Sequence, residues 1–322
     1  MTRVEKQTGF TIVELLIVIV VIGILAAITI VAFNGVSNRA KVTAIQADLN
    51  NSSKSLETFR LTTSTNEQYP ADLAAANLKA SNGTTYQYSV DNNANPVQYC
   101  LTAINGAVDY YIGTGGQPKE GTCYENHGLV GWWQLNGNAN DSSGTGANGT
   151  VAGATLTTGA NGAANGAYNF ATTADTINLS ANTALNNPTF TYTAWVKPTS
   201  VAQTMTIVGS GYGSVQFRID AGKLTLLATG VQPYAASTAA ITANAWSYVG
   251  VTFSANGTFT YYINGAAVGS GTTTRAFTYT SNHIGRTAAG VESFVGAIDG
   301  VRMYNRALSP AEMTALYTSV PQ

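Results

Sequence analysis

Acidic, histidine and cysteine side chains are scarce in the C-terminal part of this sequence, which limits the chemistry that this part can perform. Residues 128–322 hold no cysteine, one histidine, His283, and six acids, which are Asp141, Asp175, Asp220, Glu292, Asp299 and Glu312. Glycoside hydrolysis needs two carboxyl groups about 5–9 Å apart. No two of these acids stand two or four positions apart on one strand. The sequence therefore predicts no enzyme, and a serine–histidine–acid arrangement stays open because sequence does not show spatial proximity.

The chain has two cysteines, Cys100 and Cys123. Such a pair forms a disulfide in an exported protein and stays reduced in the cytosol. We predict a Cys100–Cys123 disulfide, which the loop-closure account values at on the order of 3 kcal/mol. Two free thiols are the alternative, so the interpretation depends on whether the chain is exported.

The composition is that of a turn-rich protein with a neutral polar surface. Hydrophobic residues make up 45% of the 322 residues and charged residues 10%, whereas charged residues form about 25% of an average soluble protein. The 33 glycines favour turn-rich β structure, and the length favours two domains. The net charge of −1 gives no overall field that would attract nucleic acid.

One apolar stretch, residues 10–33, contains Glu14 as its only charge. As a helix it would be about 36 Å long, enough to cross the core of a bilayer. A carboxylate at the centre of such a helix costs about 2.5–3.5 kcal/mol, and less near the helix end. The sequence therefore predicts a transmembrane helix over residues 10–33, in which Glu14 needs a partner.

Residues 6–15, KQTGFTIVEL, closely resemble the class III signal of type IV prepilins, and the match continues through residues 22–28. The resemblance implies that residues 1–9 are a leader, which a prepilin peptidase removes between Gly9 and Phe10. It also implies that the new amine of Phe10 is methylated. A plain membrane anchor is the alternative interpretation.

The same resemblance gives Glu14 a role in assembly. In the family, this carboxylate of one subunit is thought to pair with the Phe10 amine of a neighbour, which removes the cost of the buried charge and sets the axial register. Many pilins have a proline where this chain has Val31. The departure leaves open whether the helix melts in part, as such a proline would allow.

Residues 34–126 are expected to form the pilin helix continuation and a small β head. Apolar residues recur at helical spacing up to Phe59, and residues 86–90, 97–103 and 107–112 alternate as strands. Asn105-Gly106 suits a hairpin turn between the last two strands. We therefore expect a small antiparallel sheet that packs on the second half of the helix.

Residues 128–322 show short strands separated by Asn-Gly and glycine-rich turns until Ser309-Pro310 begins a short helix. This pattern predicts an all-β sandwich. Residues 128–144 and, most distinctively, 294–309 (FVGAIDGVRMYNRALS) resemble laminin G-like, concanavalin A-like lectin modules. The resemblance implies a jelly-roll of two antiparallel sheets. The predicted fold class is thus an α+β pilin, with a long N-terminal helix and a small antiparallel sheet, followed by an all-β jelly-roll sandwich.

Calcium is the one metal that the sequence favours. Asp141 stands in a loop rich in serine, glycine and asparagine, whose hydroxyl and carbonyl oxygens suit Ca²⁺. By resemblance, Asp299 lies where related modules often bring a second acid, and in those modules calcium pins the first loop to the last strands. The alternative is that Asp141 makes an Asx-turn and Asp299 pairs with Arg302 or Arg306.

The aromatic side chains of the sandwich are expected to lie mostly in its core. The tryptophans at motif positions, predicted to pack between the sheets, are Trp132, Trp133, Trp195 and Trp246. The tyrosines in loop contexts, which could stack on a sugar ring, are Tyr212, Tyr234 and Tyr279.

Together these observations predict a type IV pilus subunit that assembles with itself and other pilins into a helical filament and displays a lectin-like module for attachment or surface motility. The resemblance places it in the cytoplasmic membrane with the pilus assembly machinery, and then in an extracellular pilus. Its outer partner would be a glycan or another cell-surface ligand. The alternatives are a minor pilin, a type II secretion pseudopilin, and a membrane-tethered glycan-binding protein that does not polymerise. The sandwich is expected to hang outward from the head through residues 124–129.

Overall fold

The structure is a computed structural model of the 322-residue chain. It describes residues 12–81, 83–92, 96–106, 108–210, 215–228, 234–274, 282–287, 290 and 292–318. For residues 13–15, 18, 27, 30–32, 34, 91 and 228 it describes the backbone only.

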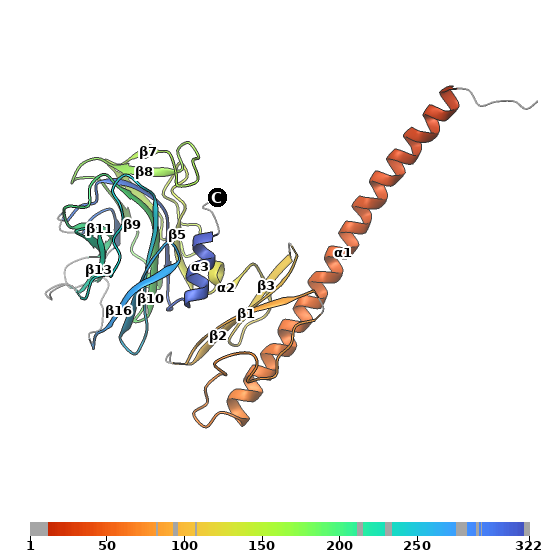
Figure 1. Ribbon diagram of the computed structural model, residues 1–322, viewed down its shortest axis with the longest axis horizontal. Coiled ribbons are helices and arrows are strands. Elements are labelled where there is room, and N and C mark those ends of the chain that lie inside the picture. The colour runs from red at the N-terminus through yellow and green to blue at the C-terminus, as the bar shows by residue number, and fades with distance from the viewer. Residues whose placement is uncertain are drawn as a thin grey trace, which may run out of the picture.

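A single helix, α1 (Ile12–Thr62), carries the N-terminal half of the pilin part (Figure 1). Its second half packs on a small antiparallel sheet in the order β1–β2–β3–β4. The strands are β1 (Thr85–Asp91), β2 (Gln98–Asn105), β3 (Val108–Gly113) and β4 (Lys119–Glu120). The core of this head forms where Ile45, Leu49 and Leu56 of α1 meet Tyr99 and Leu101 of β2.

The C-terminal part is a sandwich of two antiparallel sheets, as predicted. The large sheet has the order β16–β15–β14–β10–β18–β8–β7, with β5 also paired to β18. Its strands are β5 (Leu129–Trp133), β7 (Thr155–Thr157), β8 (Ala167–Phe170), β10 (Phe190–Pro198), β14 (Ser247–Phe253), β15 (Thr258–Ile263), β16 (Ala266–Thr272) and β18 (Gly296–Tyr304). The small sheet has the order β13–β12–β11–β17–β9–β6. Its strands are β6 (Gly149–Ala152), β9 (Thr176–Leu179), β11 (Met205–Ser210), β12 (Val215–Asp220), β13 (Lys223–Ala228) and β17 (Asn282–Ile284).

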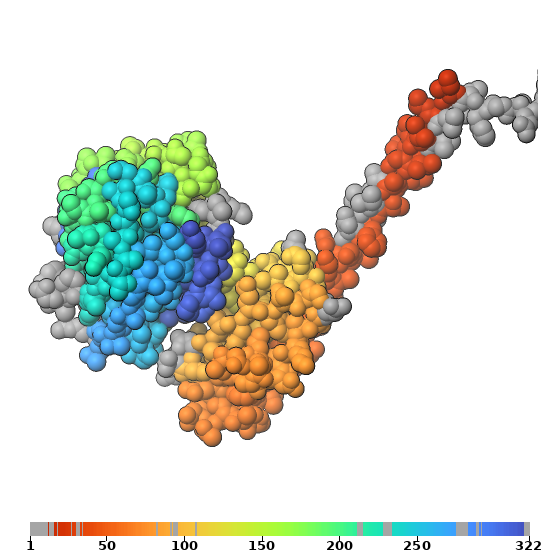
Figure 2. Space-filling view, viewed as in Figure 1, coloured from red at the N-terminus to blue at the C-terminus, as the bar shows by residue number. Residues whose placement is uncertain are grey.

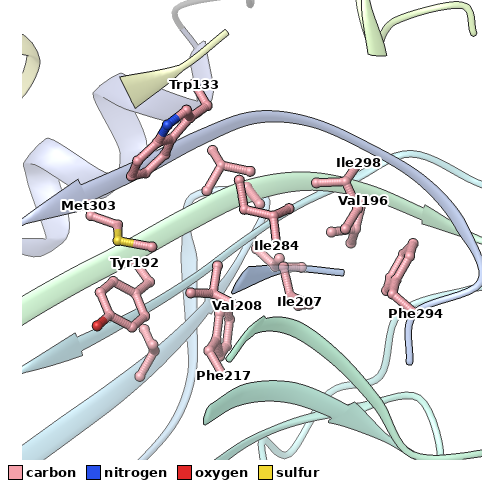
Figure 3. Packing of buried hydrophobic residues seen from close by; sticks show 14 of the residues in the cluster. Trp133, Tyr192, Val196, Ile207, Val208, Phe217, Ile284, Phe294, Ile298 and Met303 are labelled. Carbon is pink, nitrogen blue, oxygen red and sulfur yellow. The ribbon is translucent and has the colours of Figure 1, made fainter. Parts of the chain in front are cut away.

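The sandwich core lies between the inner faces of the two sheets (Figure 3). Trp133 is fully buried there, and its indole Nε1 donates to the carbonyl oxygen of Ala147 at 2.8 Å. Phe217 and Ile207 of the small sheet face Tyr192 and Val196 of the large sheet across this core. Apolar residues alternate with polar ones along β10 and β12, and the apolar set of each strand belongs to this core, so each sheet presents one apolar face.

The described part of the chain also contains three short helices: α2 (Cys123–Asn126), the 3-10 helix η1 (Thr183–Leu185) and α3 (Pro310–Thr318). The helix start predicted at Ser309-Pro310 is confirmed. A capping box forms there, because Ser309 Oγ accepts from the Glu312 amide and Glu312 Oε2 accepts from the Ser309 amide. The outer face of the large sheet makes room for α3 at Gly250, where a Cβ would strike the Met313 side chain.

The elements stack in layers from α1 through the head sheet, α2 and α3 to the large and small sheets (Figure 1). Alternation along β2 creates the first step of this stack, because Tyr99 and Leu101 face α1 whereas Cys100 faces α2. Figure 2 shows the result, in which head and sandwich touch and the N-terminal half of α1 projects away from both.

Candidate functional site

The predicted processing site, Gly9 and Phe10, lies outside the described residues. Glu14 belongs to α1, and the structure describes its backbone only. The roles predicted for these three residues therefore stay predictions.

The N-terminal half of α1 presents apolar side chains on its surface. Ile12 is 84% exposed, Phe33 73% and Val36 70%. Within the described residues, no helix combines the length and apolar character needed to span a membrane. The transmembrane segment predicted over residues 10–33 stays a prediction. An apolar patch this large on a protein surface marks a site of interaction.

The predicted disulfide is confirmed. Cys100 of β2 and Cys123 of α2 are joined, with their Cα atoms 5.9 Å apart. The amide of Cys123 also donates to Thr102 Oγ1 at 2.9 Å, so α2 is attached to the outer face of the head sheet at two points.

The sandwich is docked on this helix and does not merely hang from a linker. We call this contact the junction; it joins residues 123–128 of the head to residues 304–312 of the sandwich. Arg306 Nη2 donates to the Cys123 carbonyl at 3.0 Å and its Nε to the His127 carbonyl at 2.8 Å. Tyr304 Oη donates to the Tyr124 carbonyl at 2.7 Å.

A buried ion pair holds the guanidinium of Arg306 in place. Its Nη1 and Nη2 contact the two carboxylate oxygens of Glu312 at 3.0 and 2.7 Å. The side chains of Arg306 and Glu312 are only 7% and 8% exposed. Burial opposes ionisation of Glu312, but the Arg306 charge and the bonds from Ser309 outweigh it and lower the pKa of the carboxyl group. Sequence reasoning missed this pair and had offered Arg306 as a partner for Asp299.

His127 lies in the junction with its Nδ1 buried, and within the described residues no hydrogen bond satisfies that atom. Burial, together with the nearby charge of Arg306, lowers the pKa of His127 to about 4, against the opposing charge of Glu312. The imidazole is therefore neutral at pH 7.

We expect this histidine to weaken the fold on acidification. Because the pKa in the folded chain lies below the unfolded value of 6.5, the contribution of neutral His127 is complete above pH 6.5. It is lost between pH 6.5 and about 4, by up to about 3 kcal/mol. Urea denaturation at several pH values should show this loss in the natural chain and not in His127→Gln.

The natural chain must be compared with His127→Gln, because the titration of Asp299 changes stability with pH in the opposite direction. Burial raises the pKa of Asp299 to about 6, so the contribution of Asp299 to stability falls as the pH rises through the same range. A free-energy difference between wild type and His127→Gln that stays constant from pH 7 to 4.5 would contradict the histidine prediction.

Asp141 organises the loop between β5 and β6. Its Oδ1 accepts from the amides of Trp132 and Ser143, and the second of these bonds makes the Asx-turn named as the alternative to calcium. Its Oδ2 accepts from the hydroxyls of Ser143 and Thr145 and from the amide of Ala147. Burial opposes ionisation, and these bonds together overcome it and lower the pKa of Asp141. All five partners are donors, so the carboxylate has little capacity left for a cation.

Asp299 is tied to a different loop. Its Oδ2 accepts from the amide of Ala160 at 2.9 Å, and Asp299 is 1% exposed. Its Oδ1 has no hydrogen-bond partner within the described residues. Arg302 stacks over the Trp132 ring instead, at 4.7 Å, so neither arginine named for Asp299 pairs with it. The contacts of Asp141 and Asp299 do not fit a calcium site shared by the two.

Whether Asp141 stabilises its loop without calcium can be tested by substitution. We expect Asp141→Ala to lower stability by about 2–4 kcal/mol, because several charge-assisted bonds are lost together. The loss should be the same with millimolar calcium and with a chelator, as measured by thermal melting. A calcium-induced rise in the melting temperature that disappears in Asp299→Asn would restore a calcium site, centred on Asp299.

The remaining acids of the sandwich have structural partners. Glu292 pairs with the buried Arg218 through Nη1 at 2.9 and 3.0 Å. Asp175 accepts from the amides of Ala171 and Thr172. Across the described ranges, no group of three or more histidine, cysteine or acidic side chains gathers in one place.

The tryptophans divide between two faces of the large sheet. Trp133 is in the core as predicted, but Trp132 and Trp195 lie on the outer face, where Trp195 packs on Tyr317 of α3. Two neighbours in a strand point to opposite faces, so Trp132 and Trp133 could not both be core. Tyr234 packs against the sandwich core, whereas Tyr212 and Tyr279 lie outside the described residues.

Comparisons with known proteins match the two parts of the chain separately. The prokaryotic N-terminal methylation motif matches residues 5–30, and the concanavalin A-like lectin/glucanases superfamily matches residues 170–314. The sandwich resembles domain 4 of AbnA, a GH43 extracellular arabinanase from Geobacillus stearothermophilus, solved with arabinotriose. That likeness has a TM-score of 0.51 and 22% identity, and covers 59% of this chain and 98% of that one. It also resembles the binding domain of Paraclostridial mosquitocidal protein 1, with a TM-score of 0.52, 18% identity, and coverage of 60% of this chain and 52% of that one. These two likenesses show the fold.

The pilin part has relatives among curated proteins. Type II secretion system core protein G of Pseudomonas aeruginosa is 30% identical over 142 residues, which cover 40% of this chain and 96% of that protein. The type IV wide pilus major component PilA4 of Thermus thermophilus is 35% identical over 99 residues, covering 31% of this chain and 74% of that protein. The chain therefore belongs to the family of type IV pilins and pilin-like secretion proteins, and it carries a concanavalin A-like lectin module after its pilin part.

Proposed function

We propose that this protein is a type IV pilus subunit that polymerises through its N-terminal helix and displays the sandwich as an attachment module. The observation that carries the proposal is the layer order, in which α1 and the sandwich lie on opposite faces of the head sheet (Figure 1). A module of this size could block assembly if it covered α1. Here the exposed side of α1 stays free for the helices of other subunits.

Assembly would follow the steps that the N-terminal sequence implies. The chain would enter the cytoplasmic membrane, prepilin peptidase would cleave between Gly9 and Phe10, and the new amine would be methylated. Glu14 would then pair with the Phe10 amine of a neighbouring subunit as the pilus machinery extracts the chain. The exposed apolar side chains of α1, such as Ile12 and Phe33, would be covered by other helices in the filament.

The docked junction supports a display role. A module on a flexible linker samples many orientations, whereas Arg306 and Tyr304 fix the sandwich against α2. α3 and the head occupy part of the outer face of the large sheet, where Tyr248 and Tyr262 pack on Met313. Surfaces away from this contact are those that a filament would present to a ligand.

A second candidate is a pilin-like subunit of a type II secretion system. The likeness to core protein G, which covers 96% of that protein, favours it. The two candidates differ in abundance and place, since a pilus subunit that forms the fibre dominates purified surface filaments. Immunogold labelling of the sandwich and quantitative mass spectrometry of sheared filaments distinguish the two. Absence of the chain from surface filaments would contradict the pilus proposal.

Attachment is tested with the full chain in detergent, because the sandwich is packed against the head. We expect the chain to be retained by a subset of glycans on an array that includes arabino-oligosaccharides, chosen for the arabinotriose complex of the AbnA domain. A matched control is the same chain truncated after residue 122, which lacks the sandwich. No retention by any glycan and equal binding of both chains to cells would reject the attachment role.

A further inference from the structure

We propose that the Cys100–Cys123 disulfide is a redox-sensitive latch that keeps the sandwich docked on the head. The argument begins with α2, because the bonds across the junction end on it or directly after it. Arg306 and Tyr304 donate to carbonyls of residues 123, 124 and 127, and the Asn305 amide donates to Gly128 at 2.8 Å. Among the described junction bonds, only a long one, from Ser89 Oγ to Glu312 at 3.4 Å, reaches the head sheet directly.

The position of α2 depends in turn on few attachments. It has only four residues, and its N-cap residue Thr122 makes no side-chain capping bond. A single helical turn is not stable in isolation. Its described attachments to the head sheet are the main chain to β4, the bond to Thr102, the cluster with Tyr111 and the disulfide to β2. The disulfide is the one attachment of these that a reductant can break.

Both cysteines of the disulfide border cavities of the junction. Cys100 lines a cavity of about 260 Å³ together with His127 and Arg306. Cys123 lines a second cavity of about 290 Å³ together with Tyr124 and Glu312. Each volume is large enough to hold several water molecules. The disulfide is thus buried in the docked chain, yet open space lies on both sides of it.

The step that opens the latch is a thiol–disulfide exchange with a dithiol reductant. A reductant thiolate attacks one sulfur and forms a mixed disulfide, which releases the other cysteine as a thiol after protonation. The second reductant thiol then displaces the first cysteine. The two cysteines gain two electrons and two protons, and the dithiol becomes a cyclic disulfide.

Reduction of the disulfide should loosen the junction, while the sandwich core and the core between α1 and the head sheet stay folded. Neither cysteine belongs to the sandwich core or to the core between α1 and the head sheet. After reduction α2 keeps its chain connection through residues 101–122, but it loses its covalent hold on β2. Because Arg306 and Tyr304 bond to α2, the sandwich loses its fixed position.

Hydrogen exchange followed by mass spectrometry on the full chain in detergent tests the latch. With dithiothreitol, we expect exchange of the His127 and Asn305 amides to rise at least about tenfold, while strands β10 and β14 keep their protection. Alkylation before digestion verifies that both cysteines are reduced. Cys100→Ala/Cys123→Ala should match the reduced chain with or without reductant. The control Thr102→Val, which removes the other bond to α2, should stay docked when oxidised.

Two outcomes would overturn the proposal. Unchanged exchange at the junction in a fully reduced chain would show that the disulfide does not hold the sandwich. A parallel loss of protection in β10 and β14 would show that the disulfide supports the whole fold instead. Neither outcome depends on whether the chain forms filaments or binds glycans, so the proposed function is tested separately.

Discussion

Replacing Glu14 by alanine should abolish surface filaments, with a drop of at least about 100-fold in the amount recovered by shearing. In the assembled state the carboxylate would neutralise the Phe10 amine of a neighbour in apolar surroundings. Removing one member of a buried ion pair leaves the other charge unpaired, which costs about 3–5 kcal/mol. A loss of about 2.7 kcal/mol in one contact already lowers an association constant about 100-fold, and the loss recurs at every subunit.

The control for this experiment is the loss of a carboxylate that has no role in assembly. Glu67 is suitable, because its side chain is 77% exposed and contacts Arg60 at 3.6 Å on the surface of the head. Glu67→Gln should assemble normally, and immunoblots should show equal amounts of both variants in the membrane. An unchanged amount of surface filaments in cells that carry Glu14→Ala would favour a membrane-tethered protein that does not polymerise.

Replacing Arg306 by methionine should destabilise the junction more than any surface change of equal size. The substitution leaves Glu312 buried without its cation and removes the donors to the Cys123 and His127 carbonyls. We expect a loss of about 3–5 kcal/mol. For a domain of this size that corresponds to a fall of at least about 6 °C in the melting temperature of the sandwich.

A double-mutant cycle separates the pair from its surroundings. Arg306→Met/Glu312→Leu should recover part of the loss, because it replaces both charges by apolar groups. Arg60→Met is the matched control, since Arg60 pairs with Glu57 at 3.1 Å near the surface, and it should cost less than about 1 kcal/mol. Equal melting temperatures for Arg306→Met and Arg60→Met would contradict a stabilising role for the junction.

The sequence was most informative where function depends on local patterns. The spacing of Gly9, Phe10 and Glu14 indicates a prepilin because few other apolar segments hold one carboxylate at that position. Alternation and Asn-Gly turns indicate strands because both are properties of neighbouring residues. With only two cysteines in the chain, the disulfide pairing had one solution once export was assumed.

The junction could not be predicted in this way. Arg306 and Cys123 are 183 positions apart in the sequence. Arg306 binds backbone carbonyls, and because every residue has one, the sequence does not mark which of them it binds. Glu312 follows Ser309-Pro310, where the sequence predicts a short helix, and a position in the first turn of that helix already accounts for an acid. The available signal was an arginine, Arg306, six positions before Glu312 near the end of the sequence. The surface that Arg306 binds became visible only when the head and sandwich were placed together. The prediction that Trp132 lies in the core failed for a simpler reason, because strand alternation alone places its side chain on the outer face.

The position of the disulfide also determines how tension would travel through the molecule. A pull on a bound ligand enters the head at residue 128 and reaches Cys123 within a few residues. From there the covalent bond passes the load straight to Cys100 on β2, which is paired with β1 along seven residue pairs from Thr85 to Asp91. Residues 101–122, with β3 and β4, stand outside this path. A stretched subunit would therefore keep half of its head sheet unloaded while the other half transmits the force towards α1.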